Sequence, residues 1–435
     1  MFDVDQNSDQ VRRWSPLFGH ADFMKLWIGE TISTFGSRMG MVAVSFAAVI
    51  SLHATPFQMG LLAAAGNVPT LLFSLVAGAW VDRLRRRPLM IGADIGRTIL
   101  LATIPLATVF GILAMPQLIA VMFAAAVLDL VFDVAYRAYL PSLVADRHLL
   151  DANSKLTASE AVAEMGGFGF SGWVVQWLTA PMAVLVDAIS FLASALALAL
   201  VHTREPEPRR RERHERIARE IVDGARHIFH DRRLRALGVM AIAAGFSYSL
   251  ASTLYMLFVV NALGFEPGVL GMIFAVGGVS SLFGALAARR TAAAFGSGRA
   301  MVLGLAIEGL ALLLIPLARG NGALAASLLI AHQLLGDGAG TTYIINSVTL
   351  IQTVTPKQML GRVNATMRFL NTSSVLLGEL TAGVAGGILG LRTVMVIGAA
   401  GVVVSAGILS RSEIGTLNTA PRTKETEESP AVSYS

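Results

Sequence analysis

Long apolar runs separated by short polar ones fill the chain from about residue 20 to about residue 410. A helix needs roughly 20 residues of this kind to cross the hydrocarbon core of a bilayer. Strands are not expected, because the runs are long and do not alternate between polar and apolar positions. We therefore expect an all-α polytopic membrane protein. The pattern predicts twelve spanning helices, with ends uncertain by about 4 residues, over 22–51, 57–81, 88–112, 116–140, 156–178, 181–202, 236–262, 267–289, 299–318, 322–351, 362–389 and 392–410.

The composition supports lipid as the main solvent of this chain. Hydrophobic residues make up 54% of its 435 residues and charged residues only 14%, whereas a soluble domain averages about 25% charged residues. The net charge of +5 would suggest nucleic acid in a soluble protein, but in a membrane protein it is typical of basic cytoplasmic loops. The absence of cysteine excludes disulfides and thiolate metal sites. Residues 1–20 lack the apolar run of a cleaved signal peptide.

The loops between the predicted helices alternate between two kinds. One kind is rich in arginine and lysine, and its longest member, 203–235, contains "PRRRERHER". The other kind is very short and contributes only Arg319 and Arg392. Because basic loops stay on the cytoplasmic side of a membrane, we expect these loops and both termini in the cytoplasm. The expected location is the inner (cytoplasmic) membrane.

Two loose repeats indicate that the chain consists of two similar halves. Residues 141–157 resemble 352–368, and 78–83 resemble 284–289. Two halves around a site at the membrane midplane are a recurring design of transporters. The predicted organisation is a cytoplasmic N-terminal segment, a six-helix bundle, a basic linker, a second six-helix bundle and a disordered tail, at 1–20, 21–202, 203–235, 236–411 and 412–435 respectively.

Within the linker, apolar residues recur at helical spacing, with charged residues between them. They are Ile217, Ile221, Ala225 and Ile228. This pattern predicts an amphipathic helix on the cytoplasmic membrane surface. A plain solvated linker is the alternative.

The turn after the second predicted helix carries a pattern of glycine, aspartate and arginine. Its members are Gly78, Asp82, Arg83, Arg86 and Arg87. The pattern resembles the signature Gly-x-x-x-Asp-Arg-x-Gly-Arg-Arg/Lys of the major facilitator superfamily, with Arg85 in place of the second glycine. The second-half copy has Ala288 instead of the aspartate, so only the first copy is complete.

Further stretches narrow the resemblance to the drug:proton antiporter-3 branch, which contains macrolide-efflux and enterobactin-exporter type proteins. These stretches are "LWIGETISTFGSRM", "FQMGLLAAAGNVPTLLF", "FDVAYRAYLPSLV", "LVDAISFLASAL" and "GRVNATMRFL". The resemblance covers roughly residues 20–410. It implies the major facilitator fold, two pseudo-symmetric six-helix bundles, and export of a small molecule. One departure concerns export, because "GGFGFSG" has Phe168 where exporters usually carry proline.

The resemblance also implies a gate on the cytoplasmic side. Asp82 is expected to meet the start of the eleventh helix near Gly361, Arg362 and Asn364. Free backbone N–H groups at a helix start favour an anion, so this contact would hold the cytoplasmic side shut. Gly78 is expected to permit close approach of helices.

The basic residues of the same turn have two expected roles. The arginines of the turn, Arg87 among them, are expected to keep this loop on the cytoplasmic side. Arg83 or Arg86 is also expected to pair with carboxylates at helix ends. Asp94 and Arg97 are expected to extend this network into the third helix.

Charged side chains within the predicted helices need a reason, since each costs about 2.5–3.5 kcal/mol at the bilayer centre. Asp129, Asp133 and Arg137 lie on one face of the fourth helix. Asp133 can pair with Arg137 one turn away, whereas Asp129 has no local partner. Because loss of water favours the protonated form of a carboxylic acid, Asp129 is the first candidate for proton coupling. A buried ion pair that fixes helix packing is the alternative.

Three more carboxylates are candidates for proton coupling. Glu30 in the first helix either titrates or is neutralised by Arg38. Asp337 lies near His332 among glycines of the tenth helix, and Glu379 lies in the eleventh.

Two other intramembrane carboxylates are assigned structural roles. Glu308 is expected to face a packing partner, because the ninth helix is peripheral in the fold that the resemblance implies. Asp187 lies in a stretch typical of the branch and is expected to be structural.

A substrate cavity is expected to be lined by one arginine and several aromatic side chains. Aromatic rings there would stack on a bulky amphiphilic substrate or a cation. The alternative is a place in the core or in the aromatic belt at the membrane interface. The candidates are Arg38, Tyr136, Tyr248, Tyr255, Tyr343 and Phe369.

The sequence lacks the motifs of ATP-driven transport and of enzymes. It has no Walker-type loop, no cluster with metal-ligand spacing and no Gly-x-Ser-x-Gly elbow. We expect a monomeric secondary transporter, not an enzyme, without cofactor or metal, that exports a hydrophobic or amphiphilic small molecule by proton antiport. Its expected partners are that substrate, protons and membrane lipids, and not nucleic acid. The alternatives are a metabolite importer or uniporter of the same fold, and a non-transporting membrane scaffold or sensor.

Overall fold

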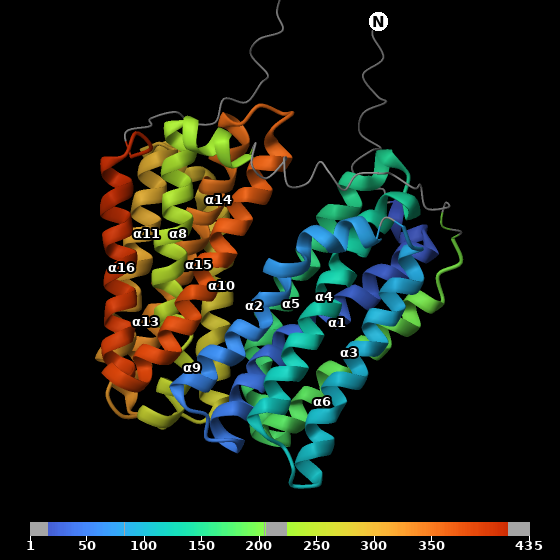
Figure 1. Cartoon of the computed structure of the whole chain (residues 1–435), viewed down its shortest axis with the longest axis horizontal. Coiled ribbons are helices and arrows are strands. Elements are labelled where there is room, and N and C mark those ends of the chain that lie inside the picture. Colours follow the sequence, from blue (N-terminus) through green and yellow to red (C-terminus); the bar gives the residue numbers. More distant parts are fainter. Residues whose placement is uncertain (1–15, 82, 204, 206–223, 416–435) are drawn as a thin grey trace, which may run out of the picture.

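The computed structural model describes residues 16–81, 83–203, 205 and 224–415 (Figure 1). The predicted N-terminal segment up to residue 15 and the predicted tail from residue 416 lie outside this part of the chain. All elements within the described residues are helices, and the prediction of an all-α fold is confirmed.

The first half of the described chain forms one bundle of long helices. The first helix, α1, continues directly into a π-helical turn, η2. The elements are η1 (Pro16–Gly19), α1 (Ala21–Phe46), η2 (Ala47–Ser51), α2 (Pro56–Val81), α3 (Arg86–Val109), α4 (Met115–Leu143), η3 (Asp146–His148), α5 (Leu149–Leu178) and α6 (Ala180–Ala199).

The second half forms another bundle, in which several helices contain short irregular turns. The elements are α8 (Arg232–Ser252), α9 (Tyr255–Leu257), η4 (Phe258–Ala262), α10 (Pro267–Phe295), α11 (Ser297–Leu312), α12 (Leu314–Leu317), α13 (Ala323–His332), η5 (Gln333–Asp337), α14 (Gly338–Val354), α15 (Leu360–Leu389) and α16 (Leu391–Arg411).

Helix starts follow local signals in the sequence. Asp231 precedes α8, and its side chain accepts hydrogen bonds from the backbone N–H groups of Arg233 and Leu234. His20 caps α1 in the same way through the N–H of Phe23. Pro267 begins α10, where its missing N–H costs nothing.

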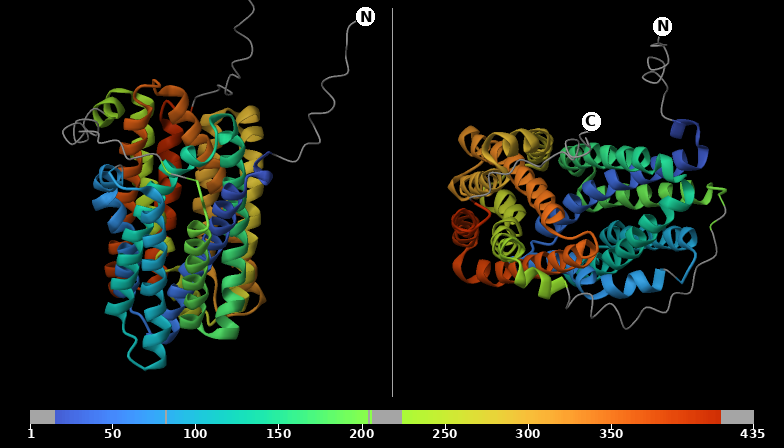
Figure 2. Two further views of the ribbon diagram at one scale, coloured as in Figure 1. Left: turned by 90° about the vertical axis from the view of Figure 1, so that its right-hand side faces the viewer. Right: turned by 90° about the horizontal axis from the view of Figure 1, so that it is seen from above.

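The helices group into two bundles, α1–α6 and α8–α16, which Figure 1 shows spread apart at the top and close together at the bottom. The same grouping is visible from above in the right-hand view of Figure 2. Within the first bundle α1 packs on α5 and α6, and α3 on α4 and α6. Within the second, α8 packs on α15 and α16, and α11 on α14 and α16. The described helices therefore form two bundles, as the repeats in the sequence predict.

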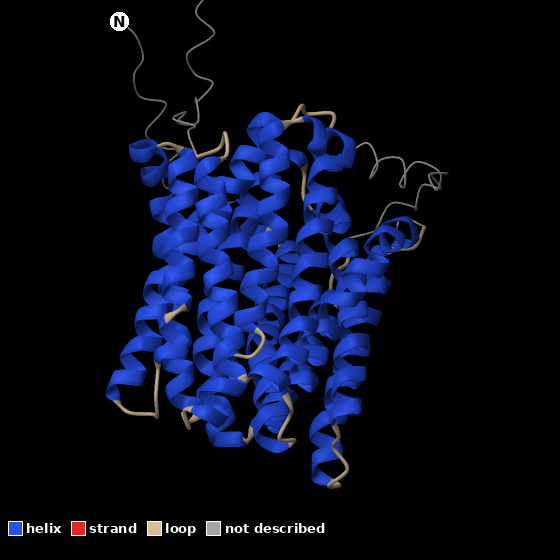
Figure 3. Cartoon of the chain, turned by 60° about the vertical axis from the view of Figure 1, so that its left-hand side comes forward, coloured by secondary structure: helices blue, strands red, loops and turns tan. Residues whose placement is uncertain are grey.

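Nine helices among the described residues are long and apolar enough to cross a membrane. Figure 3 shows the described part of the chain as helices joined by short loops. Helix α2, helix α5 and the run from α13 through η5 to α14 coincide with three more predicted segments but do not belong to this set. The count of twelve crossings therefore stays a prediction.

Two tight turns mark the repetition of the halves. Thr179 alone joins α5 to α6, and Gly390 alone joins α15 to α16. Both residues have a positive φ, 79° and 82°. Glycine adopts this backbone without strain, whereas threonine does so at a cost of about 1–3 kcal/mol. The two turns lie about 210 residues apart, as the repeats in the sequence do.

The bundles touch at the end opposite the start of α1, which we call the closed end. There Gly60 of α2 lies against the backbone of Glu379 on α15. Gly172 of α5 lies against the backbone of Pro267 and Gly271 at the start of α10. A Cβ at either Gly60 or Gly172 would lie within 3.0 Å of backbone atoms, so only glycine permits these contacts.

The last part of the linker, 224–230, is helical and packs on the second bundle. Gly224 lies against Thr366 of α15, and Ile228 is 1% exposed. Ile228 therefore contacts the bundle rather than the membrane surface that its spacing predicts. The earlier residues of the predicted amphipathic helix, up to 223, lie outside the described residues.

Candidate functional site

A cavity of about 870 Å³ is lined by residues of both bundles. Most of its wall comes from the second bundle, through α8, α10, α11, η5 and α14. The first bundle contributes mainly through α5, with Glu164, Met165 and Phe168. This volume lies in the range of about 300–1,000 Å³ that small-molecule sites occupy.

Three carboxylates line this cavity, Glu164, Glu308 and Asp337. Two of them lie in niches that glycines leave open. The carboxylate of Asp337 lies where a side chain at Gly277 of α10 would stand, and that of Glu308 lies where a side chain at Gly340 of α14 would stand. The sequence predicts Asp337 as a candidate. It predicts a packing role for Glu308, which does contact α14 but also faces the cavity.

Aromatic side chains form another part of the wall. Of the six predicted cavity residues, Tyr248, Tyr255 and Tyr343 line it, and the other three are not part of its lining. The ring of Tyr255 is tilted against Phe274, with 5.9 Å between ring centroids, and against His332, at 6.3 Å. These rings provide apolar faces beside the carboxylates.

Arg97 of α3 organises a charged network inside the first bundle. Its guanidinium pairs with Asp94 and, at 2.7 Å, with Asp129 of α4. It also stacks on Phe191, 3.9 Å from the ring centroid, and on Phe132, at 4.6 Å. Asp94 and Arg97 therefore pair with each other and with α4, and their predicted link to the network of the basic turn stays a prediction. Asp129 therefore has its partner on another helix rather than on α4, and the alternative of an ion pair that fixes helix packing has this geometry.

The other charged residues inside the first bundle differ in their partners. Arg137 pairs with Asp133 at 2.9 Å, as the helical spacing predicts. Arg38 pairs with Glu160 of α5 at 3.7 Å. Arg38 therefore does not pair with Glu30. Oε2 of Glu30 is buried without a hydrogen-bond partner.

The two glycines of the predicted gate make no close helix contact in this conformation. Asp82 lies outside the described residues. A Cβ at Gly78 or at Gly361 would meet no atom within 4 Å, and Asn364 is exposed. Close packing at Gly78 is therefore wrong for this conformation, because the bundles are spread apart at this end. We call it the open end.

At the open end a carboxylate caps the third helix. Glu205 accepts hydrogen bonds from the backbone N–H groups of Arg86 and Arg87, at 2.8 and 3.3 Å. Its carboxylate also pairs with the side chain of Arg86, at 3.8 Å. The predicted pairing of Arg86 with a carboxylate at a helix end is confirmed, with an anion at the positive end of the α3 dipole.

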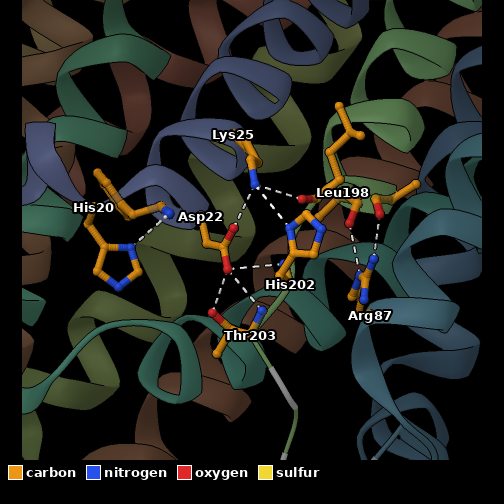
Figure 4. A network of polar contacts seen from close by, with 10 residues as sticks. His20, Asp22, Lys25, Arg87, Leu198, His202 and Thr203 are labelled. Carbon is orange, nitrogen blue, oxygen red and sulfur yellow. Dashed lines mark hydrogen bonds and ion pairs between the residues drawn. The ribbon is translucent and has the colours of Figure 1, made fainter.

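The start of the linker is fixed to the first bundle beside this cap (Figure 4). Asp22 of α1 accepts hydrogen bonds from the backbone N–H groups of His202 and Thr203, at 3.0 and 2.9 Å. Lys25 pairs with Asp22 at 2.8 Å. Arg87 donates to two carbonyl groups at the end of α6. The arginine thus holds helices together in addition to any role in topology.

Two remaining predicted carboxylates occupy helix contacts. Glu379 of α15 accepts a hydrogen bond of 2.8 Å from Asn67 of α2 and lies between the bundles. Asp187 of α6 is 5% exposed and packs against Gly36 and Gly40 of α1. The structural role that the sequence predicts for Asp187 agrees with this position.

Glu164 is the site residue that sequence reasoning missed. It shares α5 with Asp151, Lys155 and Glu160, and this mixed charge resembles that of a solvated helix face. A signal was present, since Glu164 precedes a long apolar run that contains Gly169 and other small residues. A carboxylate at the edge of such a run can line a cavity as well as one inside it.

Comparison with known proteins agrees with this architecture. Residues 26–379 match the family model of the Major Facilitator Superfamily. The chain is 28% identical over 263 residues to the multidrug efflux pump Tap of Mycolicibacterium fortuitum, a match that covers 58% of this chain and 63% of Tap. It is 24% identical over 377 residues to YfiS, an uncharacterized MFS-type transporter of Bacillus subtilis (strain 168), covering 85% of this chain and 88% of YfiS. The match to Tap thus spans less than two thirds of that pump.

Solved structures of the same fold are more distant in sequence. The nucleoside transporter NupG has a TM-score of 0.72 at 12% identity, covering 89% of this chain and 98% of NupG. A bacterial homologue of the iron transporter ferroportin, in an inward-facing state, has a TM-score of 0.73 at 15% identity, covering 91% and 98%. These likenesses concern the fold alone.

Proposed function

The chain belongs to the Major Facilitator Superfamily, and from this premise we propose that it is a secondary active transporter of the inner (cytoplasmic) membrane. It exports a hydrophobic or amphiphilic small molecule in exchange for protons, by alternating access. The observation that carries the proposal is a cavity of ligand size lined by two bundles that contact each other tightly at the closed end.

The charge of the loops supports an orientation for this structure. The turn at 83–87 and the start of the linker lie at the open end, beside the start of α1 (Figure 1). Basic loops remain in the cytoplasm, so the open end is cytoplasmic and the conformation faces inward. The gate around Asp82 and Gly361 then closes when the bundles rock together at this end.

Export is supported by the similarity to Tap, a multidrug efflux pump. The structural neighbours include a nucleoside transporter and a homologue of an iron transporter. The fold alone therefore does not indicate the substrate of this chain. The membership of the antiporter-3 branch, which the sequence stretches suggest, is part of this proposal.

Proton coupling is proposed to depend on the cavity carboxylates rather than on Asp129. A coupling group must change the free energy of substrate binding when it gains a proton. Asp337 and Glu308 line the cavity, whereas Asp129 pairs with Arg97 outside its lining. We therefore place Asp337 before Asp129 as the coupling candidate. Glu30 and Glu379, each with one buried unpaired oxygen, follow as further candidates.

The test is transport by the full chain in proteoliposomes with a pH gradient of either sign. The compounds are a macrolide, erythromycin, and an aromatic dye, ethidium, and a pH-sensitive dye reports proton movement. Antiport predicts that each compound accumulates on the side from which protons leave. Accumulation of a compound on the side that protons enter would indicate an importer. Flux that does not depend on the pH gradient would indicate a uniporter. If no compound moves protons or accumulates, the proposal of drug export fails.

A further inference from the structure

The three carboxylates of the cavity come from both bundles and lie near one contact. Met165 of α5 lies against Gly278 of α10. The residue before Met165 is Glu164, and the residue before Gly278 is Gly277, whose niche holds the carboxylate of Asp337. The contact of α5 with α10 therefore brings Glu164 of the first bundle toward Asp337 of the second.

Electrostatic interactions connect the same three residues. The carboxylate of Glu164 acts on Asp337, and Asp337 acts on Glu308. Like charges in a partly desolvated site repel one another more strongly than they do in water. The three residues thus form a row of carboxyl groups that crosses from one bundle to the other.

No basic side chain balances this row among the described residues of the lining, apart from one imidazole. The lining contains no lysine and no arginine within that part of the chain. His332 is the imidazole, and an ordinary imidazole is mostly uncharged at neutral pH. None of the three carboxylates has a side-chain hydrogen bond or ion pair within the described residues.

Aromatic rings lie beside the row. Glu308 and Asp337 both act electrostatically on Tyr248, and Tyr255 stands on the same wall with Phe274. A ring face attracts a cation and also packs against an apolar body. A pocket with negative charge on one part of its wall and rings on another matches a ligand with both properties.

We propose that the cavity binds an organic cation with an aromatic or aliphatic body. Its positive group lies between Glu164 and the pair of Asp337 and Glu308, and its body lies against Tyr248 and Tyr255. The inference deepens the proposed function and rests on it. Because the carboxylates belong to different bundles, a cation between them removes their repulsion and favours closure of the open end.

The test uses two ions of the same shape and opposite charge, tetraphenylphosphonium and tetraphenylborate. Each is titrated onto the purified full chain in lipid nanodiscs at constant pH, with binding measured at equilibrium. We expect the cation to bind at least tenfold more tightly than the anion. Equal affinities, or preference for the anion, would overturn the proposal without reference to any variant.

Isosteric variants then locate the cation. Asp337→Asn, Glu308→Gln and Glu164→Gln are each expected to weaken tetraphenylphosphonium binding about tenfold or more. The matched control is Glu160→Gln, one turn earlier on α5, whose side chain is 59% exposed and paired with Arg38. It is expected to bind the cation as the unaltered chain does. Size-exclusion profiles and circular dichroism identify any variant that has not folded.

The outcomes separate this inference from the proposed function. If all three variants bind the cation within twofold of the unaltered chain, the cation does not lie at the carboxylates and the inference fails. If the chain transports a neutral compound yet shows no preference between the two ions, export stands and the substrate class is wrong. Cation binding without transport of any compound would support the site and contradict the transport proposal.

Discussion

Asn67 of α2 donates a hydrogen bond of 2.8 Å to the carboxylate of Glu379 on α15, and this bond joins the two bundles at the closed end. Glu379 is 7% exposed, and its second oxygen, Oε2, is buried without a partner. In the alternating access that we propose, this contact forms in one state and breaks in the other. The bond therefore contributes to the energy difference between the two states.

Removal of the amide is expected to favour opening of the closed end. A hydrogen bond to a charged group contributes about 1.5–3 kcal/mol, so Asn67→Ala should shift the ratio of the two states by about tenfold or more. The chain has no cysteine, so spin labels can be placed at Ile112→Cys and Leu324→Cys without background. Both positions are exposed and belong to different bundles. Pulsed electron paramagnetic resonance should show a larger population at long distance.

Asn153→Ala is the matched control for this experiment. Asn153 is an exposed asparagine whose side chain bonds only to its own helix, at Leu149. Its removal should leave the distance distribution unchanged. If Asn67→Ala also leaves it unchanged, the bond to Glu379 has no part in the equilibrium between states.

Arg97 is expected to stabilise the first bundle more than any exposed ion pair. It is 4% exposed, and Asp94, its partner on the same helix, is 0% exposed. Arg97→Ala leaves that carboxylate buried without a cation, which costs about 3–5 kcal/mol. The midpoint of thermal unfolding in detergent, followed by circular dichroism, should fall by several degrees.

An exposed pair on α4 provides the comparison. Arg137 and Asp133 have side chains that are 71% and 36% exposed. Such pairs contribute about 0–1 kcal/mol, so Arg137→Ala should shift the midpoint little. Equal shifts for Arg97→Ala and Arg137→Ala would show that the buried network is not the stabilising one.

The sequence was sufficient to predict the helices, because their length and apolar character are local properties. The segment predicted at 267–289 is α10 (Pro267–Phe295), and that at 181–202 is α6 (Ala180–Ala199). Pairs within one helix were predictable for the same reason. Asp133 and Arg137 lie one turn apart, and the period of the helix alone brings them together.

Partners from other helices were beyond reach of the sequence pattern. Asp129 pairs with Arg97, 32 residues away on α3, and only the packing of α3 on α4 brings them together. Glu164 reaches the cavity because glycines let α5 approach α10. The helical period shows which face a residue occupies, but it does not show which helix packs on that face.

The structure changes the residue at which proton coupling is expected. In the transport assay, Asp337→Asn should abolish accumulation driven by a pH gradient, because the cavity loses its response to protons. Exchange of labelled for unlabelled ethidium without a gradient should persist, which separates coupling from folding. Asp129→Asn should retain at least part of the gradient-driven accumulation. If Asp129→Asn abolishes it and Asp337→Asn does not, the coupling group lies in the first bundle, as the sequence alone suggested.

The niche at Gly277 is expected to position the carboxylate of Asp337. A Cβ at this glycine would also lie 2.7 Å from Nε2 of Gln333. The side chains of Asp337 and Gln333 must therefore both move in Gly277→Ala. Alanine raises helix propensity by about 1 kcal/mol relative to glycine, so lost binding would not follow from a weaker helix. Gly66→Ala on α2 is the control, since a Cβ there would meet no atom within 4 Å. Gly277→Ala should weaken tetraphenylphosphonium binding several-fold while Gly66→Ala retains it, and equal binding by both would show that the niche does not fix the carboxylate.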